Sequence, residues 1–568
     1  MKRTSFWPLV AVFATALVVL PACEAMAVVP AVVGPIQALV AILPQLLAML
    51  GAAIVAMLKP ETYKAAFKFL WHQKLLSLGL VAAVALIIWG APKLFGGSVE
   101  AEKSGQPWMA MRGSALRPGA VPGARGPKDA AKIKWSYAGK KRERVDSSPA
   151  VVGNRIYTSS AVLSLFGGDT TGTGTIYCRD TDGGGVVWEY NGEGMDGGRL
   201  VSVFSSPAIA GDYDGEKNED GSVKQGRYLV CGEGYHQDIN SRFFCLDLKP
   251  TREGKNPKLQ WFKQATSHVE SSPCVHKCAQ DGKYRVYIGT GDDGLWCVDL
   301  EGDGKLNWMV EGTPAYYLHA KCEGAEKVKA LAGKKVEIKC TIERFGATIT
   351  DPGQVLIMKV DDVREVQDLP SVSADAGKAY QRTIYGEVEV GEQPTIENPE
   401  AAGRRIVLEA ATGVRIRVPR YYLDVESAPA AADFPKDPAK PEAGLETLVF
   451  FGTGLGGEGG VGCVDAVTGE ERWFYKVGDI PVFSPPTVVK GVKIRVTDDK
   501  GQPVEKVTDV LLVGYGEGDF VNVGSGPGYV LCLDIHDVKD GAPRKLWETP
   551  VGSTILGAVA AAGSAGPV

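Results

Sequence analysis

The sequence predicts an all-β protein built around a β-propeller of four-stranded blades. A strand–turn–strand unit recurs five times after residue 130, and the 70 glycines cluster in short loops between apolar runs. Both features are typical of arrays of short antiparallel strands. The 568 residues exceed one ordinary core, and a hydrophobic content of 45% is that of a folded chain. A net charge of -5 argues against nucleic acid as a partner.

The N-terminal hundred residues form a separate, apolar part of the chain. Residues 36–58 are apolar over a length that spans a bilayer, and residues 75–89 also do so if the next few residues contribute. The loop between these runs carries four lysines and one acid, so the positive-inside rule places it in the cytoplasm. We therefore expect a bacterial membrane anchor, with the propeller on the periplasmic or extracytoplasmic side.

The expected boundaries follow from these runs. Residues 1–27 form a signal-like or first transmembrane segment, residues 28–95 two hydrophobic anchor helices, and residues 96–131 a linker rich in glycine and proline. Three alternatives stay open for the first segment: a membrane span, a signal peptide cleaved after Ala27, or a lipoprotein signal cleaved before Cys23. All three put the propeller on the same side of the membrane.

The clearest copy of the repeat ends in Trp473. One strand ends at Asp465, Thr468 and Gly469 form a turn, and a second strand carries the tryptophan. The other four copies have an aspartate and a tryptophan at these positions: Asp180 and Trp188, Asp247 and Trp261, Asp299 and Trp308, Asp534 and Trp547. Each copy follows an apolar strand that starts at a Ser-Ser-Pro-like opening and then a second, alternating strand, which in four of the copies ends in a Gly-x-Gly loop. Each unit therefore has the four strands of one blade.

The tryptophans and aspartates of the repeat have structural roles. A large indole once per blade fills the wedge between neighbouring blades, with its N–H bonded to a backbone carbonyl. The aspartate accepts N–H groups of the turn that follows it. Blades 1–3 occupy residues 132–310, and blades 4 and 5 with a closing strand occupy residues 423–568. Residues 132–137 and 555–561 are the lone last and first strands of a partial closing blade.

The pattern Ala-x-Asp-x-x-Thr-Gly-x-x-x-Trp resembles the repeat of the pyrroloquinoline-quinone-like (PQQ-like) β-propellers, with Cys463 standing where the family usually has alanine. This WD40-like quinoprotein superfamily includes quinoprotein alcohol dehydrogenases and the BamB-like propeller lipoprotein of the outer-membrane barrel assembly machinery. The resemblance covers roughly 130–310 and 424–560. It implies a protein-binding or scaffolding function, with help in cell-envelope assembly, and an envelope protein, a peptide or a polymer bound on the propeller face.

The enzymes of this superfamily supply the main alternative function. For them the resemblance implies two adjacent cysteines over the quinone, a tryptophan beneath it, and an aspartate base beside calcium. This sequence has no Cys-Cys pair, so we expect no catalytic residues and no PQQ cofactor. A PQQ-dependent oxidoreductase or another cofactor-binding enzyme is the first alternative, and a structural membrane component is the second.

The repeat is interrupted at residues 311–422. Strand-like alternation occurs there over residues 335–342, 354–360, 382–390 and 405–418. These strands predict a small β-rich, OB-like domain that emerges on the face of the Gly-x-Gly loops. It would partly cover the central mouth and bind a partner, or act as a spacer. A degenerate blade is the alternative, because residues 407–413 imitate the repeat with Glu409 in the place of the aspartate.

The chain has 11 cysteines, and five of them have packing roles. Five occupy one equivalent strand position per blade, too far apart for disulfides: Cys178, Cys245, Cys297, Cys463 and Cys532. Cys274 with Cys278, and Cys322 with Cys340, are candidate disulfides or free thiols. No Cys-x-x-Cys occurs and the six histidines are scattered, which argues against a zinc site.

Acidic residues near the central mouth form the candidate ligand site. His268, Glu270 and Glu426 lie just before first strands and should reach the same face as the acids of the Gly-x-Gly loops, which are Glu233, Asp238, Asp292, Asp293, Glu458, Glu517 and Asp519. Their convergence would hold a cation or a basic partner; the alternative is solvated loop charge. A weaker candidate is a calcium-like loop without its closing glutamate, with ligands Asp212, Asp214, Asn218 and Asp220.

Overall fold

The computed structural model describes most of the chain after residue 108. The described residues are 109–117, 133–140, 142–162, 173–196, 198–217, 223–235, 240–348, 353–370, 381–391, 395–397, 407–409, 413–437, 440–454, 459–497, 502–517 and 526–559. They belong to one compact unit, and no helix within them has the length and apolarity needed to cross a membrane. The predicted signal-like segment and anchor helices, residues 1–95, lie outside the described residues.

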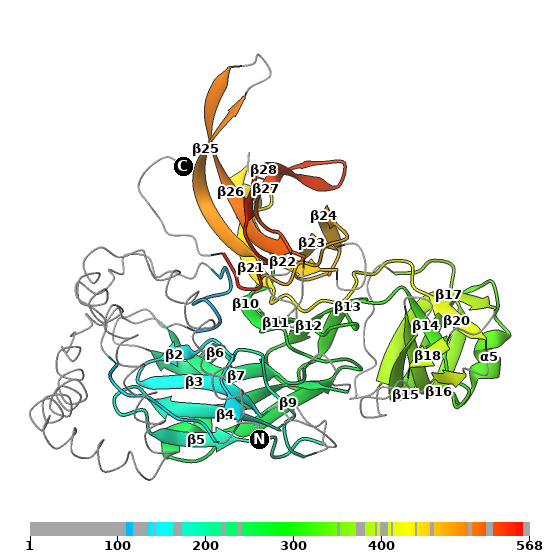
Figure 1. Ribbon diagram of the computed structural model, residues 1–568, viewed down its shortest axis with the longest axis horizontal. Helices are drawn as coiled ribbons and strands as arrows, with labels where there is room; N and C mark the ends of the chain where they lie inside the picture. Colours follow the sequence, from blue (N-terminus) through cyan, green and yellow to red (C-terminus); the bar gives the residue numbers. More distant parts are fainter. Residues whose placement is uncertain are drawn as a thin grey trace, which may run out of the picture. The chain divides into compact units, whose positions relative to one another are not determined.

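Five antiparallel sheets are built from strands that are consecutive in the chain, and they form the blades (Figure 1). Blade 1 contains β1 (Glu143–Arg144), β2 (Ala150–Val152), β3 (Arg155–Val162), β4 (Thr173–Asp180) and β5 (Val186–Tyr190). Blade 2 contains β6 (Ala208–Lys217), β7 (Val223–Gly232), β8 (Arg242–Asp247) and β9 (Lys258–Gln264). Blade 3 contains β10 (Cys274–Lys277), β11 (Tyr284–Gly289), β12 (Leu295–Asp299) and β13 (Leu306–Val310). Blades 4 and 5 contain β21 (Ala430–Pro435), β22 (Leu445–Thr453), β23 (Gly459–Asp465) and β24 (Glu471–Gly478); and β25 (Thr487–Thr497), β26 (Pro503–Gly516), β27 (Gly528–Lys539) and β28 (Ala542–Val551). In blade 1 both β1 and β2 pair with β3.

The hydrophobic cores lie between neighbouring blades. Four core clusters join blade 1 to 2, 2 to 3, 3 to 4 and 4 to 5. Trp308 of blade 3 is 1% exposed, and its Nε1 donates to the carbonyl of Ala466 in blade 4 at 3.2 Å. Trp261 of blade 2 donates in the same way to the carbonyl of Leu300 in blade 3, at 2.9 Å. These indoles fill the wedges between blades and satisfy their only polar atom there.

Residues just before blade 1 and just after blade 5 make contacts of the kind that neighbouring blades make with each other. Trp135 donates to the carbonyl of Thr181 at 3.0 Å and packs against Gly184 of blade 1, as the indoles of blades 2 and 3 pack on the blades that follow them. Ile555 packs on Gly514 of blade 5, as valines from the following blades pack on the equivalent glycines of blades 2 to 4. Trp547 of blade 5, however, is 40% exposed, because no described blade follows it.

The prediction of lone strands at these borders differs from the structure. Residues 133–140 and 554–559 form no strand. A strand exists only where a neighbour takes up its backbone hydrogen bonds, and the middle strands that would supply them are absent from the described residues.

Residues 109–117 lie against the inner strands of four blades. Backbone N–H groups of blades 2, 4 and 5 donate to this segment: Ile209 to Met109 at 2.7 Å, Ala431 to Ala115 at 3.0 Å, and Val488 to Leu116 at 3.0 Å. Arg117 is fully buried and donates to the carbonyls of Pro429, Ser272 and Pro273 at 2.6, 2.9 and 3.1 Å. The sequence predicted only a linker over 96–131. That prediction is wrong for residues 109–117, which pack against the blades.

The insertion forms a barrel with its own hydrophobic core. It contains β14 (Ala315–Leu318), α5 (Ala325–Lys329), β15 (Lys335–Thr348), β16 (Gln354–Glu365), β17 (Gln381–Val390), β18 (Thr395–Glu397), β19 (Val407–Glu409) and β20 (Val414–Arg417) (Figure 1). The ring closes as β14–β16–β15–β17–β20–β14, with only β14 and β16 parallel. This is the strand order of an OB barrel whose chain starts at the third strand. The residues that imitate the repeat belong to this barrel, so the degenerate-blade alternative is wrong.

The cysteines of the described residues are buried free thiols. The Sγ of Cys278 lies 3.0 Å from the Tyr287 hydroxyl, and the Sγ of Cys322 lies 3.1 Å from the carbonyl of Leu356. The candidate disulfides of Cys278 with Cys274 and of Cys322 with Cys340 are therefore not formed. Burial raises the pKa of Cys274 to about 11 and of Cys340 to about 12, so these thiols stay protonated and unreactive.

Candidate functional site

A cavity of about 360 Å³ lies where the openings of the blades meet. The residue that precedes each Ser-Ser-Pro-like opening lines it, one from each blade: Asp146, Phe204, Glu270, Glu426 and Phe483. Leu556, which follows blade 5, also lines it. Met111 of the N-terminal segment contributes to the wall as well. The lining thus follows the repeat, but its chemistry differs from blade to blade.

A belt of serines fixes the backbone at these positions. Ser271 donates to the carbonyl of Ser427 at 3.2 Å, Ser427 to that of Ser484 at 3.1 Å, and Ser484 to that of Gly557 at 2.9 Å. Within a blade the same hydroxyl accepts a backbone N–H from the second strand, as in Gly289 to Ser271 at 3.1 Å. Each serine therefore ties its own blade to the next one. This explains why the openings converge on one cavity.

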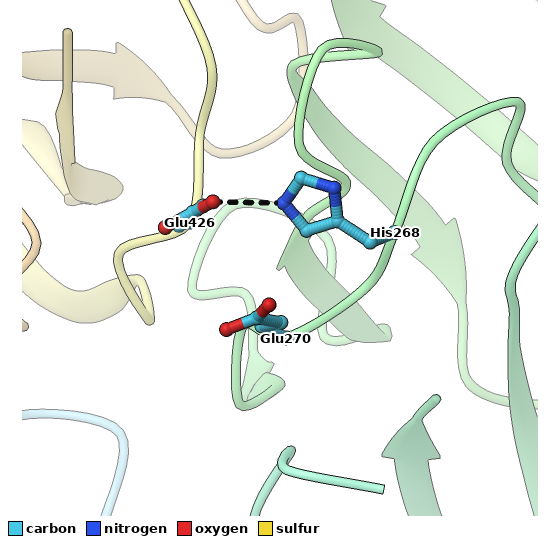
Figure 2. A group of neighbouring side chains, drawn as sticks. All are labelled: His268, Glu270 and Glu426. Carbon is cyan, nitrogen blue, oxygen red and sulfur yellow. Dashed lines mark hydrogen bonds and ion pairs between the residues drawn. The ribbon is translucent and has the colours of Figure 1, made fainter. Parts of the chain in front are cut away.

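Glu270 and Glu426, in the wall of the cavity, belong to a cluster of ionisable side chains that are mostly buried (Figure 2). His268 Nε2 lies 2.8 Å from Glu426 Oε1, and ligand atoms of His268, Glu270 and Glu426 all lie within 4.8 Å of one another. Asp424 Oδ1 lies 4.0 Å from the same nitrogen. On the other side of the ring, His268 Nδ1 lies 3.1 Å from the Ser267 hydroxyl, which donates to Asp292 at 3.2 Å.

The charges of this cluster shift the pKa of its members. Burial lowers the pKa of His268, but the hydrogen bond with Glu426 and the charges of Asp424, Glu426 and Glu270 outweigh it and raise the pKa to about 10. Burial and the neighbouring carboxylate of Glu426 raise the pKa of Asp424 well above its usual range. Burial is also the main cause of the raised pKa of Asp292. Negative charge is therefore concentrated at this wall and is partly neutralised by protons.

Three aromatic side chains also line the cavity. The rings of Phe204 and Tyr235 are 5.0 Å apart between centroids, and Phe483 joins them in the lining. Asp146 is paired with Arg144, whose Nε lies 3.0 Å from Oδ2. Arg144 is the one cationic side chain among the described lining residues. The cavity thus combines acidic and aromatic surfaces.

This lining does not fit PQQ. The quinone carries three carboxylates, which would face the carboxylates of Glu270 and Glu426. The single lining arginine is already engaged by Asp146. Binding of such an anion would cost free energy rather than gain it.

Three other acids predicted for the mouth are described, and they lie away from the cavity lining. Glu233 forms a buried ion pair with Arg242 and accepts the N–H of Val201 at 3.0 Å. Asp293 is buried against the barrel and accepts a hydrogen bond from Arg382 at 3.1 Å. Glu517 is exposed and does not line the cavity. Three of the predicted residues lie outside the described residues: Asp238, Glu458 and Asp519.

The calcium-like loop is only partly described. Asp212 accepts hydrogen bonds from the Tyr284 hydroxyl at 2.9 Å and from Lys277 Nζ at 3.2 Å, so its carboxylate serves contacts with blade 3. The side chain of Asp214 and the residues Asn218 and Asp220 lie outside the described residues.

The aspartates of the repeat hold their turns. Asp465 Oδ1 accepts the N–H groups of Val467 and Thr468, both at 2.9 Å. The same contacts recur in the other blades: Asp182 and Gly183 donate to Asp180 at 2.8 and 3.1 Å, Lys249 to Asp247 at 2.8 Å, and His536 to Asp534 at 3.2 Å. Asp299 instead accepts from the Asn307 amide at 2.7 Å.

Sequence reasoning missed several residues of the site. Asp424, Phe204 and Phe483 were not singled out, nor was Tyr235. Aligning the positions before each Ser-Ser-Pro-like opening would have found Phe204 and Phe483, because the residue one position before it lines the cavity in every blade. Tyr235 follows a Gly-x-Gly loop and has no such signal.

Comparisons with known proteins add little to this picture. No protein-family model matches the sequence, and no curated protein does either. Among solved structures, the chain is similar to Chaetomium thermophilum Sqt1 bound to the N-terminus of the ribosomal protein L10. The identity is 13% over 70% of this chain and 84% of that chain, with a TM-score of 0.21.

Proposed function

We propose that this chain is a protein-binding propeller of the PQQ-like repeat type, whose cavity receives a basic segment of an envelope protein. The observation that carries the proposal is the cavity lining, in which Glu270 and Glu426 are combined with the aromatic rings of Phe204, Tyr235 and Phe483. Carboxylates attract a lysine or arginine head group, and aromatic faces contact its alkyl stem and its charge. A basic side chain therefore fits both kinds of surface.

The proposal includes a membrane location. The apolar runs within residues 1–95 and the lysines between them support an anchor, with the propeller on the extracytoplasmic side. The partner would then be a protein of the same compartment. The barrel of residues 311–422 contributes none of the described residues that line the cavity, so it is proposed as a separate contact surface and not as a lid.

A binding assay tests the role of the cavity. Fluorescent peptides rich in arginine or lysine, and matched peptides rich in glutamate, are titrated against the purified full-length protein. We expect only the basic peptides to bind, and we expect Glu270→Gln together with Phe204→Ala to weaken that binding by about 1–3 kcal/mol or more. Glu517→Gln, an exposed acid outside the lining, is the control. Equal binding of both peptide classes would overturn the proposal.

A further inference from the structure

We propose that His268, Glu426, Glu270 and Asp424 form a binding site for a divalent transition-metal ion of the zinc or manganese class. Among the described residues, the first three are the one group of such side chains close enough to share an ion. Metal–nitrogen and metal–oxygen bonds are each about 2.1 Å long, so two ligands of one ion lie roughly 3 Å apart. The separation of 2.8 Å between His268 Nε2 and Glu426 Oε1 is close to that value.

Asp424 gives an independent indication of a missing cation. Its side chain is 6% exposed, and no hydrogen-bond donor of the described residues reaches Oδ1. That oxygen lies 4.0 Å from His268 Nε2 and thus faces the cluster. A buried carboxylate oxygen without a donor is costly, and a bound cation removes that cost. Asp424 also adopts a φ of 25°, a strained conformation of the kind found at ligand sites.

The groups behind the histidine orient it for metal binding. The Ser267 hydroxyl donates to Asp292, so its oxygen is available to accept a hydrogen bond from His268 Nδ1. A proton held at Nδ1 leaves Nε2 as the ligand atom. Metal-binding histidines are commonly fixed in this way by a neighbouring carboxylate or hydroxyl.

A metal ion can reach the site from the cavity, and the carboxylates of the cluster attract it. Glu270 and Glu426 both line the cavity, so a solvated ion can reach the cluster from it. Glu270 and Glu426 also serve the proposed peptide binding, so a bound divalent ion offsets part of the negative charge that attracts the peptide. The metal site is therefore a function beyond the proposed peptide binding.

The ligand types select the class of metal. Calcium and magnesium prefer oxygen ligands only, whereas an imidazole nitrogen combined with carboxylates suits zinc, manganese and iron. The sequence argued against zinc because no local ligand spacing is present. That argument considers local spacing only, whereas the ligands proposed here come from two blades, with His268 and Glu426 158 residues apart in the chain.

Metal titration of the chelator-treated full-length protein tests the proposal. Isothermal titration with Zn²⁺ and Mn²⁺ should show a single site that Ca²⁺ does not fill. Glu426→Gln and Ser267→Ala should each weaken binding by about 10-fold or more. His536→Gln is the matched control, because His536 also lies 2.8 Å from a carboxylate, that of Asp509, but outside any such group among the described residues. Binding that is unchanged by Glu426→Gln, or lost equally in His536→Gln, would overturn the proposal.

A second measurement does not depend on the folding of variants. Wild-type protein loaded with Mn²⁺ should show nitrogen coupling from one imidazole in pulsed electron paramagnetic resonance. A spectrum without this coupling would contradict the proposed metal site. The peptide titrations are repeated with and without the metal. If the protein binds the metal but not the basic peptides, the proposed function is wrong. If it binds the basic peptides but not the metal, the metal site is wrong.

Discussion

Arg382 of the barrel and Asp293 of blade 3 form a buried ion pair. Their Nη1 and Oδ1 atoms lie 3.1 Å apart, and the side chains are 9% and 0% exposed. Thr266 donates to the same carboxylate at 2.6 Å, and the guanidinium lies 5.4 Å from the Trp296 ring centroid. Burial lowers the pKa of Arg382, but the neighbouring charge of Asp293 outweighs it and the net pKa is raised. This pair fixes the insertion to the turn between β11 and β12.

Removal of the arginine should therefore destabilise the protein strongly. Arg382→Met leaves the carboxylate of Asp293 buried without its cation, and we expect a loss of about 3–5 kcal/mol in the free energy of unfolding. Chemical denaturation measures it. Arg364→Met is the control in the same barrel: Arg364 pairs with Glu337 at 2.8 Å but is 63% exposed, so about 1 kcal/mol or less is expected. Equal losses in both variants would contradict this account.

Trp308, which is buried, and Trp547, which is exposed, should contribute differently to the stability of the protein. Trp308→Ala empties a wedge between blades 3 and 4, and a loss of about 3–5 kcal/mol is expected. Trp547→Ala removes a side chain that is already largely solvated, so the loss should be about 1 kcal/mol. Thermal unfolding of the two variants compares them. A larger effect at Trp547 would show that a further blade covers it.

The N-terminal segment should be part of the folding unit. Arg117→Met leaves the buried carbonyls of Pro429, Ser272 and Pro273 without their donor, and each such carbonyl costs about 1–3 kcal/mol. We expect a loss of about 3 kcal/mol or more, together with protease cleavage near residues 109–117. Retained stability and protease resistance would show that the contacts of this segment with the blades do not stabilise the protein.

Acid should destabilise the blades through their turn aspartates. Burial raises the pKa of Asp465, but hydrogen bonds from Thr468, Val467 and Arg472 outweigh it and lower the pKa below its usual value. The lowered pKa means that the stabilising contribution is present above about pH 4 and is lost as the pH falls through the folded-state pKa. Asp465→Asn should reduce the loss of melting temperature between pH 5 and pH 3, and the exposed Asp182→Asn should not.

Much of the blade architecture could be predicted because the repeat is local. The strand that ends at Asp465, its turn and Trp473 lie within a few residues of one another, and hydrophobic alternation defines the remaining strands. Blades 1 to 3 follow each other directly, as do blades 4 and 5 after the insertion. The repeat also predicts which blades are neighbours, since each tryptophan is expected to pack against the blade that follows it.

The contacts that depend on long separations could not be predicted. Arg117 reaches carbonyls that are more than 150 residues away, and nothing in the local sequence of residues 109–117 indicates burial. The cluster around His268 likewise joins two blades across the insertion. Charged residues in loops are usually solvated, so only the three-dimensional arrangement separates Glu426 in the cavity wall from exposed Glu517.

The most direct test of the central claim, that the cavity receives a partner, is site-specific photo-crosslinking in cells. A photoreactive phenylalanine analogue replaces Phe204 in the lining or, as a control, Tyr421, which is 42% exposed and does not line the cavity. Crosslinks from position 204 to one envelope protein, competed by a basic peptide and absent from position 421, are the expected result. The same crosslinks from both positions, or none from position 204, would contradict the claim.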